Sequence, residues 1–158
     1  LFIKRIKNNE PVTVTDPLMT RFLMSLTESV ELVDYAFKNG RSGDLFVKKA
    51  PAATVQTLVK ALEEILNKKA NILIIGGRHG EKMHETLVSR EELANASDEE
   101  TYFRVNSDRR LLNYEKYITE GLQRLNKIDD YSSNNTKILT VPEAVELLIS
   151  NREVQSYL

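Results

Sequence analysis

A helical apolar stripe that leads into a strand-like apolar run is the feature that most limits the fold of this chain. Six apolar residues recur at the three- and four-residue intervals of one helix face: Val55, Leu58, Val59, Leu62, Ile65 and Leu66. Residues 71–75 then form an almost purely apolar run that stops at Gly76-Gly77, which predicts a buried strand. The polar segment 78–87 follows that strand, and such a loop is a common place for a binding site.

Other segments predict the same mixture of helices and short strands. Ser25 and Glu28 fit a capping box before a helix that Gly40 ends in the left-handed conformation. Further helix or capping patterns lie at 1–7, at Thr54, at Ser89 with Glu92 and at Thr140 with Glu143. Short strands are predicted at 12–15, 44–48 and 102–105. Residues 126–137 are polar and turn-rich. With no internal repeat, the pattern is α+β within these residues, or an appended part of a larger α/β protein.

Composition excludes several classes of protein. The 22 basic and 23 acidic residues leave a net charge of -1, so no overall field favours nucleic acid or an anionic membrane, and we expect neither as a partner. The chain has no cysteine, which excludes disulfides and thiolate metal sites. No apolar run approaches the roughly 20 residues of a bilayer span, and residues 1–7 lack the features of a signal peptide. We therefore expect a cytoplasmic protein.

The segment Arg78-His79-Gly80-Glu81-Lys82 places two cations and a carboxylate around a glycine. A planar guanidinium can bind a diphosphate bidentately, and the Glu81 carboxylate can accept hydrogen bonds from ribose hydroxyls. The same composition is also typical of a solvated charged loop that binds nothing. Both interpretations remain open on spacing alone.

Arg21 is the one cation among the apolar residues of segment 15–24. An arginine in such surroundings needs a partner anion, which is either a carboxylate of the protein or a phosphate of a ligand. His79 and His84 lie five residues apart, whereas helical pairs that share a zinc ion usually lie four apart. We therefore expect no metal site and interpret the histidines as polar contacts.

Several catalytic motifs are missing from the sequence. The glycines, at positions 40, 43, 76, 77, 80 and 121, form no Gly-x-Gly-x-x-Gly fingerprint for a dinucleotide. No tyrosine is followed four residues later by lysine, and no nucleophile elbow is present. We assign no catalytic residue within these 158 residues and expect the chain alone to be inactive.

Three ordered segments, 11–22, 43–54 and 78–87, together resemble the polysaccharide-biosynthesis branch of the extended short-chain dehydrogenases/reductases, and 131–136 resembles a fourth motif of that branch. The resemblance implies an α/β enzyme whose Rossmann-fold domain, expected upstream of Leu1, binds NAD or NADP and carries a Tyr-x-x-x-Lys pair. This chain then corresponds to the C-terminal substrate-binding part. We expect residues 1–137 to form the UDP-sugar-binding portion and 138–158 a C-terminal helix and tail.

The resemblance also implies roles for individual residues. Arg21 and Arg78 would bind the diphosphate of a UDP-sugar from two sides. Glu81 would accept hydrogen bonds from the ribose hydroxyls, and Lys82 is a further candidate for substrate binding. The motifs are most similar to the 5-inverting UDP-N-acetylglucosamine 4,6-dehydratases of surface-polysaccharide biosynthesis, with a UDP-glucose or UDP-N-acetylglucosamine 4-epimerase as the alternative. An alternative of another class is a non-catalytic nucleotide-binding or interaction module. We also expect a homo-oligomer.

Overall fold

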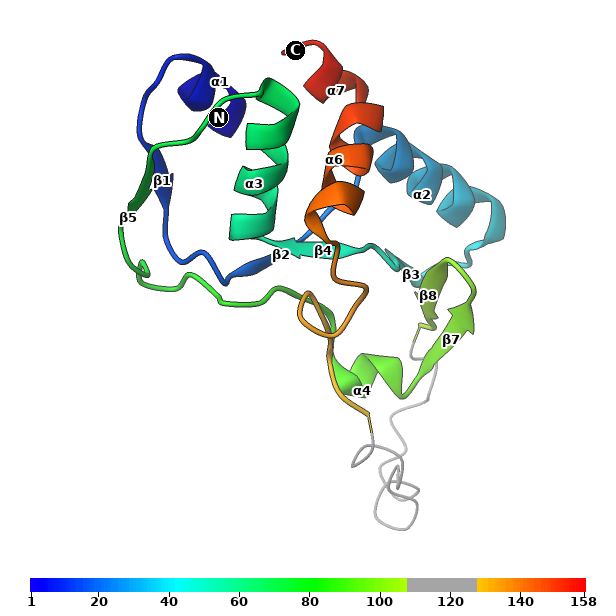
Figure 1. Ribbon diagram of the computed structural model, residues 1–158. Coiled ribbons are helices and arrows are strands. Elements are labelled where there is room, and N and C mark those ends of the chain that lie inside the picture. The colour runs from blue at the N-terminus through cyan, green and yellow to red at the C-terminus, as the bar shows by residue number, and fades with distance from the viewer. Residues whose placement is uncertain (108–127) are drawn as a thin grey trace. The chain divides into compact units, whose positions relative to one another are not determined.

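The computed structural model describes residues 1–107 and 128–158, and these residues form two compact units (Figure 1). The first unit comprises Leu1–Leu23, Ala50–Glu85 and Ser133–Leu158, and the second comprises Met24–Lys49 and the described part of Thr86–Ser132. Both units mix helices with short strands, which confirms the predicted α/β character. Of the turn-rich segment predicted at 126–137, residues 126 and 127 lie outside the described residues.

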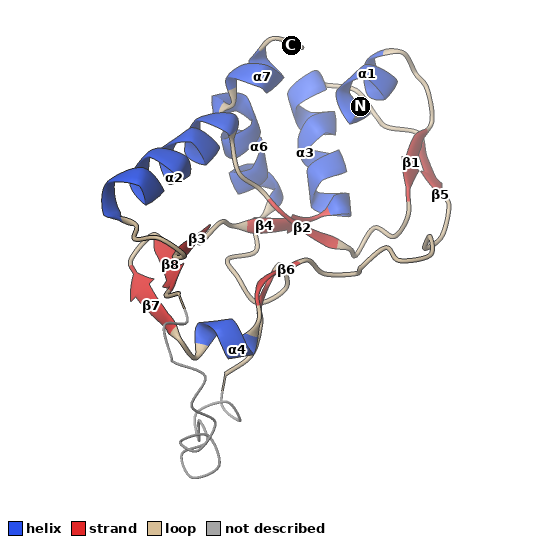
Figure 2. Cartoon of the chain, turned by 180° about the vertical axis from the view of Figure 1, so that it is seen from behind, coloured by secondary structure: helices blue, strands red, loops and turns tan. Residues whose placement is uncertain are grey.

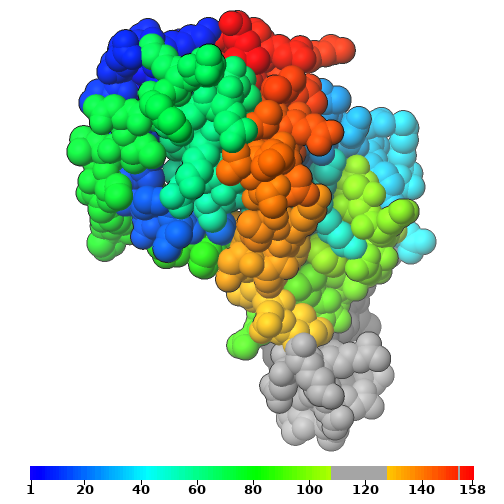
Figure 3. Space-filling model, in the orientation of Figure 1, coloured from blue at the N-terminus to red at the C-terminus, as the bar shows by residue number. Residues whose placement is uncertain are grey.

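Helix α3 (Val55–Leu66) is the centre of the first unit. Helices α1 (Phe2–Lys7) and α6 (Val141–Ser150) pack against it, and α7 (Arg152–Gln155) follows α6. Figure 3 shows α3 and α6 side by side on one face. Within the described residues, none of the helices is long and apolar enough to cross a bilayer.

The predicted apolar stripe of α3 supplies the core of the first unit. Val59 and Leu62 lie in one buried cluster, and Ala61 lies in a second. The first cluster is completed by Ile6, Val12 and Val14, and the second by Ala53, Leu139 and Ala144. Thr54 caps the helix, because its hydroxyl accepts the Thr57 amide at 3.0 Å.

The strands of the first unit form two separate pairs. β1 (Val12–Val14) pairs in parallel with β5 (Ile72–Ile74), and β2 (Thr20–Phe22) pairs antiparallel with β4 (Ala52–Thr54). The prediction of a buried strand at 71–75 is right about the strand and wrong about its burial, because Ile74 is 61% exposed. Among the strands that the structure describes, β5 has β1 as its single neighbour, whereas parallel strands are usually covered on both faces.

The second unit is built on an antiparallel sheet with one long helix (Figure 2). The sheet has the order β3-β8-β7, and its strands are Leu45–Lys48, Tyr102–Val105 and Ala96–Glu99 respectively. Helix α2 (Leu26–Asn39) contacts β3, and α4 (Arg90–Leu93) contacts β7 and β8. A second pair joins β6 (Thr86–Val88) to β9 (Tyr131–Ser132).

Helix α2 begins as the sequence predicts but ends differently. Its capping box between Ser25 and Glu28 is present, with the Glu28 amide donating to the Ser25 hydroxyl at 3.1 Å. Gly40 ends the helix in an extended conformation, with φ -79° and ψ 154°, so the predicted left-handed stop is wrong. Tyr35 stacks on Tyr102 with ring centroids 4.4 Å apart, and this contact attaches the helix to the sheet.

Candidate functional site

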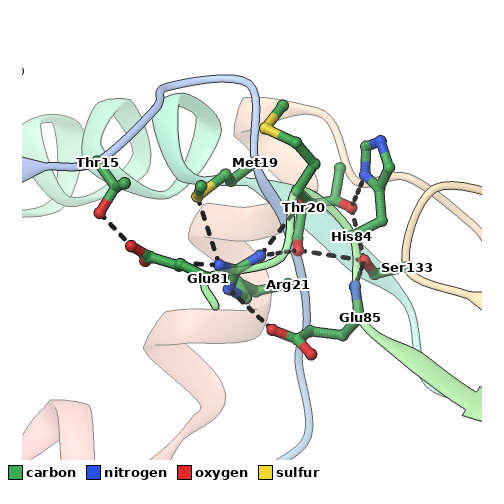
Figure 4. Close-up of polar contacts among 9 residues, drawn as sticks. Thr15, Met19, Thr20, Arg21, Glu81, His84, Glu85 and Ser133 are labelled. Atoms are coloured by element: carbon green, nitrogen blue, oxygen red, sulfur yellow. Dashed lines mark hydrogen bonds and ion pairs between the residues drawn. The ribbon is translucent and has the colours of Figure 1, made fainter. Parts of the chain in front are cut away.

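The charged segment 78–85 is attached to the strand that carries Arg21. The Thr20 amide, in β2, donates to the Met83 carbonyl at 3.0 Å. Between β1 and β2 the chain turns at Asp16, whose carboxylate accepts the Leu18 amide at 2.7 Å. These contacts bring the end of β1, the start of β2 and the charged segment together within the first unit (Figure 4).

Arg21 lies between two carboxylates. Its guanidinium nitrogens are 3.8 Å from Glu81 Oε1 and 3.6 Å from Glu85 Oε1. Arg21 Nη1 also donates to the carbonyls of Thr20 (2.8 Å) and Met83 (3.3 Å). The partner anion of Arg21 is therefore a pair of protein carboxylates in this structure. The Arg21 side chain is 27% exposed, so part of it remains accessible to solvent.

Glu81 is oriented by two neighbours. Its carboxylate accepts a hydrogen bond from the Thr15 hydroxyl at 3.1 Å and pairs with Arg21. The Glu81 amide donates to the Arg78 carbonyl at 3.1 Å, which closes a tight turn. Gly80 lies third in that turn with φ +81°, a backbone conformation that glycine adopts without strain. The turn thus explains why a glycine lies between Arg78 and Glu81.

Arg78 and Lys82 extend into solvent. Neither side chain has an ion pair or a side-chain hydrogen bond with any residue that the structure describes, and both residues are exposed. The structure therefore brings Arg21 and Glu81 together, while Arg78 and Lys82 stay uncommitted cations on the same segment. Two such cations can bind an anion without first breaking an internal ion pair.

A buried network of hydroxyl groups holds the charged segment against β2. Ser133 is fully buried, and its hydroxyl lies 2.6 Å from the Thr20 hydroxyl and accepts the Glu85 amide at 2.9 Å. His84 Nδ1 is 2.8 Å from the same Thr20 hydroxyl, so this histidine makes a polar contact. No cluster of three His, Cys, Asp or Glu side chains suited to a metal ion occurs among the described residues.

Several residues of this site were given no role from the sequence, among them Thr15, Thr20, Glu85 and Ser133. Ser133 lies in the polar segment 131–136, whose composition is typical of an exposed turn. Alternation along β2 would have indicated that Thr20 and Arg21 point to opposite faces, but a three-residue strand gives too short a pattern. Glu85 is recognised only when the charged segment is placed against β2.

A dinucleotide cofactor does not fit the described residues. The long helices begin at capped residues, with Ser25 at α2 and Thr140 at α6. A pyrophosphate site instead needs a glycine-rich turn from a parallel strand into a helix. A Cβ added at Gly76, Gly77 or Gly80 would meet no atom within 4 Å, so these glycines form no tight cradle.

Two family models match this sequence along most of its length. A polysaccharide biosynthesis protein model matches residues 1–107, and a polysaccharide biosynthesis protein C-terminal model matches residues 108–155. Both agree with the family that the motifs resemble.

Two curated relatives are similar to this chain over its whole length. Proteins named UDP-glucose 4-epimerase from Rickettsia rickettsii (strain Sheila Smith) and Rickettsia bellii (strain OSU 85-389) are 51% and 52% identical over all 158 residues. The chain spans about half the length of these relatives, covering 46% of each.

A solved structure shows the same fold. The X-ray structure of Pen from Bacillus thuringiensis matches 95% of this chain and 43% of its own, with a TM-score of 0.75 and 28% identity. Together with the family models, this likeness shows that the chain belongs to the polysaccharide biosynthesis protein family and includes its C-terminal part.

Proposed function

We propose that this chain is the substrate-binding part of a UDP-glucose 4-epimerase. The observation that supports this proposal most directly is the identity of 51% or 52% to curated relatives of that name, over the whole chain. The charged site of the first unit supplies a physical reason, because it offers cations and a carboxylate of the kind that a nucleotide diphosphate and a ribose require.

Each predicted site residue receives a role in this proposal. Arg21 and Arg78 bind the diphosphate, Glu81 accepts hydrogen bonds from the ribose hydroxyls, and Lys82 adds a further positive charge. The turn closed between Arg78 and Glu81 places a cation and a carboxylate three residues apart on one exposed segment. Arg78 and Glu81 are therefore close enough in sequence to contact the diphosphate and the ribose of one nucleotide.

The relatives change the order of the two enzymatic alternatives. The motifs alone favour a UDP-N-acetylglucosamine 4,6-dehydratase, whereas the curated relatives carry the epimerase name. The epimerase alternative is therefore the better supported of the two. An activity assay of the full-length protein distinguishes it from the dehydratase.

Further properties of the full-length protein belong to the same proposal. NAD or NADP serves as its hydride carrier and is bound mainly by the Rossmann-fold domain expected upstream of Leu1. The protein acts in the cytoplasm and forms a homo-oligomer, and residue 137 divides the UDP-sugar-binding portion from the C-terminal tail.

An activity assay of the full-length protein tests the proposed reaction. With UDP-glucose as substrate, we expect UDP-galactose to form, as followed by proton NMR of the anomeric signals. Formation of a 4-keto-6-deoxy sugar from UDP-N-acetylglucosamine, with no epimerisation of UDP-glucose, would favour the dehydratase. A protein that binds UDP but converts neither sugar would favour the non-catalytic nucleotide-binding module.

A further inference from the structure

Arg21 is paired with two carboxylates in this structure, so its positive charge is already shared before any phosphate binds. Glu81 and Glu85 lie within 3.8 Å and 3.6 Å of its guanidinium. One positive and two negative charges give this trio a formal charge of -1. Arg78 and Lys82 on the same segment can attract a diphosphate, but at Arg21 itself the two carboxylates repel its phosphates at short range.

The two carboxylates differ in what else they contact. Glu81 also accepts the Thr15 hydroxyl, and its proposed task is to hold the ribose. Among the described residues, the Glu85 carboxylate has no ion-pair partner other than Arg21. Within the described residues, the Glu85 carboxylate therefore forms an ion pair with Arg21 alone.

The main chain fixes Glu85 in this position. The Ser133 amide donates to the Glu85 carbonyl at 2.8 Å, and the Glu85 amide donates to the Ser133 hydroxyl at 2.9 Å. Because Ser133 is fully buried, these bonds hold the backbone of Glu85 without using its carboxylate. The carboxylate, 43% exposed, can therefore turn away from Arg21 while the backbone stays in place.

We propose that Glu85 is an internal counter-anion that competes with the substrate diphosphate for Arg21 and so limits how tightly the site holds UDP. This inference rests on the proposed function. When the site is empty, Glu85 holds the guanidinium in position. When a diphosphate binds, the two anions share or exchange the same cation, and the residual repulsion favours release of the nucleotide.

Neutralising Glu85 tests this role, because the expected effect has the opposite sign to that of a lost structural contact. Calorimetric titration of the full-length protein with UDP should show Glu85→Gln binding about two- to fivefold more tightly than wild type, the range expected for a partly exposed charge pair. The gain should shrink at high salt, since screening weakens exposed charges. Uridine, which lacks phosphate, should bind both proteins equally.

Two further variants keep the test decisive. Glu85→Ala removes the same charge without adding an amide and should also bind UDP more tightly. Glu146→Gln, on the exposed face of α6, makes the same change in net charge and should leave the affinity unchanged. Wild-type binding of UDP with equal or weaker binding by both Glu85 variants would overturn the inference alone. Absence of UDP binding by the wild type would overturn the proposed function, and this inference with it.

Discussion

Ser133 and Glu85 are joined by two hydrogen bonds although they lie 48 residues apart in the sequence. The Ser133 amide donates to the Glu85 carbonyl, and the Glu85 amide donates to the Ser133 hydroxyl. The same hydroxyl lies 2.6 Å from that of Thr20. One buried serine therefore fixes the charged segment against the strand that carries Arg21.

Replacing Ser133 by alanine should destabilise the protein by about 1–3 kcal/mol, because the Glu85 amide and the Thr20 hydroxyl lose a buried partner. Urea unfolding followed by circular dichroism measures the change. Ser150→Ala is the matched control, since that hydroxyl is exposed and donates to the Leu147 carbonyl. A Ser133 variant as stable as the Ser150 variant would show that the network contributes nothing.

The N-terminal cap of α3 should contribute measurable stability. Thr54→Ala removes the oxygen that accepts the Thr57 amide, at a cost of about 1 kcal/mol. Thr54→Ser keeps the oxygen and should retain most of that stability. Thermal unfolding of the two variants separates them, and equal midpoints would contradict the assigned cap.

Packing around α3 predicts a contrast between two valines. Val59 is fully buried in the core of the first unit, whereas Val30 on α2 is 61% exposed. Val59→Ala should cost about 2 kcal/mol through lost burial and a residual cavity, while Val30→Ala should change stability by less than about 0.5 kcal/mol. Equal losses in chemical denaturation would place Val59 outside the core.

Stability should fall in acid partly through Asp44. The Arg41 amide donates to the Asp44 carboxylate at 2.9 Å, and Nε and Nη2 of Arg104 donate to it at 3.0 and 2.5 Å. The Arg41 amide first, and then the Arg104 guanidinium, lower the pKa of Asp44 from 3.8 to about 2. A pKa that is lower in the folded state stabilises the fold above the unfolded value. That contribution is lost as the pH falls from about 4 to about 2.

The Asp44→Asn variant should therefore show a shallower decline of unfolding free energy with pH across that window. Urea unfolding at several pH values measures the slope. Glu10→Gln, the matching change of carboxylate to amide at an exposed position, serves as the control. An unchanged slope for Asp44→Asn would contradict the assigned pKa.

The sequence predicts the elements whose determinants are local. The stripe of α3 and the capping boxes at Ser25, Ser89 and Thr140 involve residues within a few positions of each other, and the structure confirms them. Strands β2 and β4 were not predicted, because each has three residues and the partner lies about 30 positions away. Their pairing depends on the fold of the whole unit.

The residues of the candidate site likewise fall into those that the local sequence predicts and those that depend on the fold. Charge type and spacing single out Arg21, Arg78, Glu81 and Lys82, and the structure brings the first and third together. The contact between Arg21 and Glu85 could not be predicted, since it requires the loop after β5 to lie against β2. Buried Ser133 was equally hidden, because its polar neighbours are typical of an exposed turn.

Binding of UDP to the full-length protein and to its Arg78→Ala variant tests the central claim most directly. Arg78 is an exposed cation with no internal ion pair among the described residues, so its loss should leave the fold intact. Calorimetry should show the variant binding about ten- to a hundredfold more weakly, as expected for a lost charge-assisted contact. Lys69→Ala, which removes an exposed cation on another loop that pairs with Glu63, should bind as the wild type does. Equal affinity of the Arg78→Ala variant and the wild type would contradict the proposed diphosphate site.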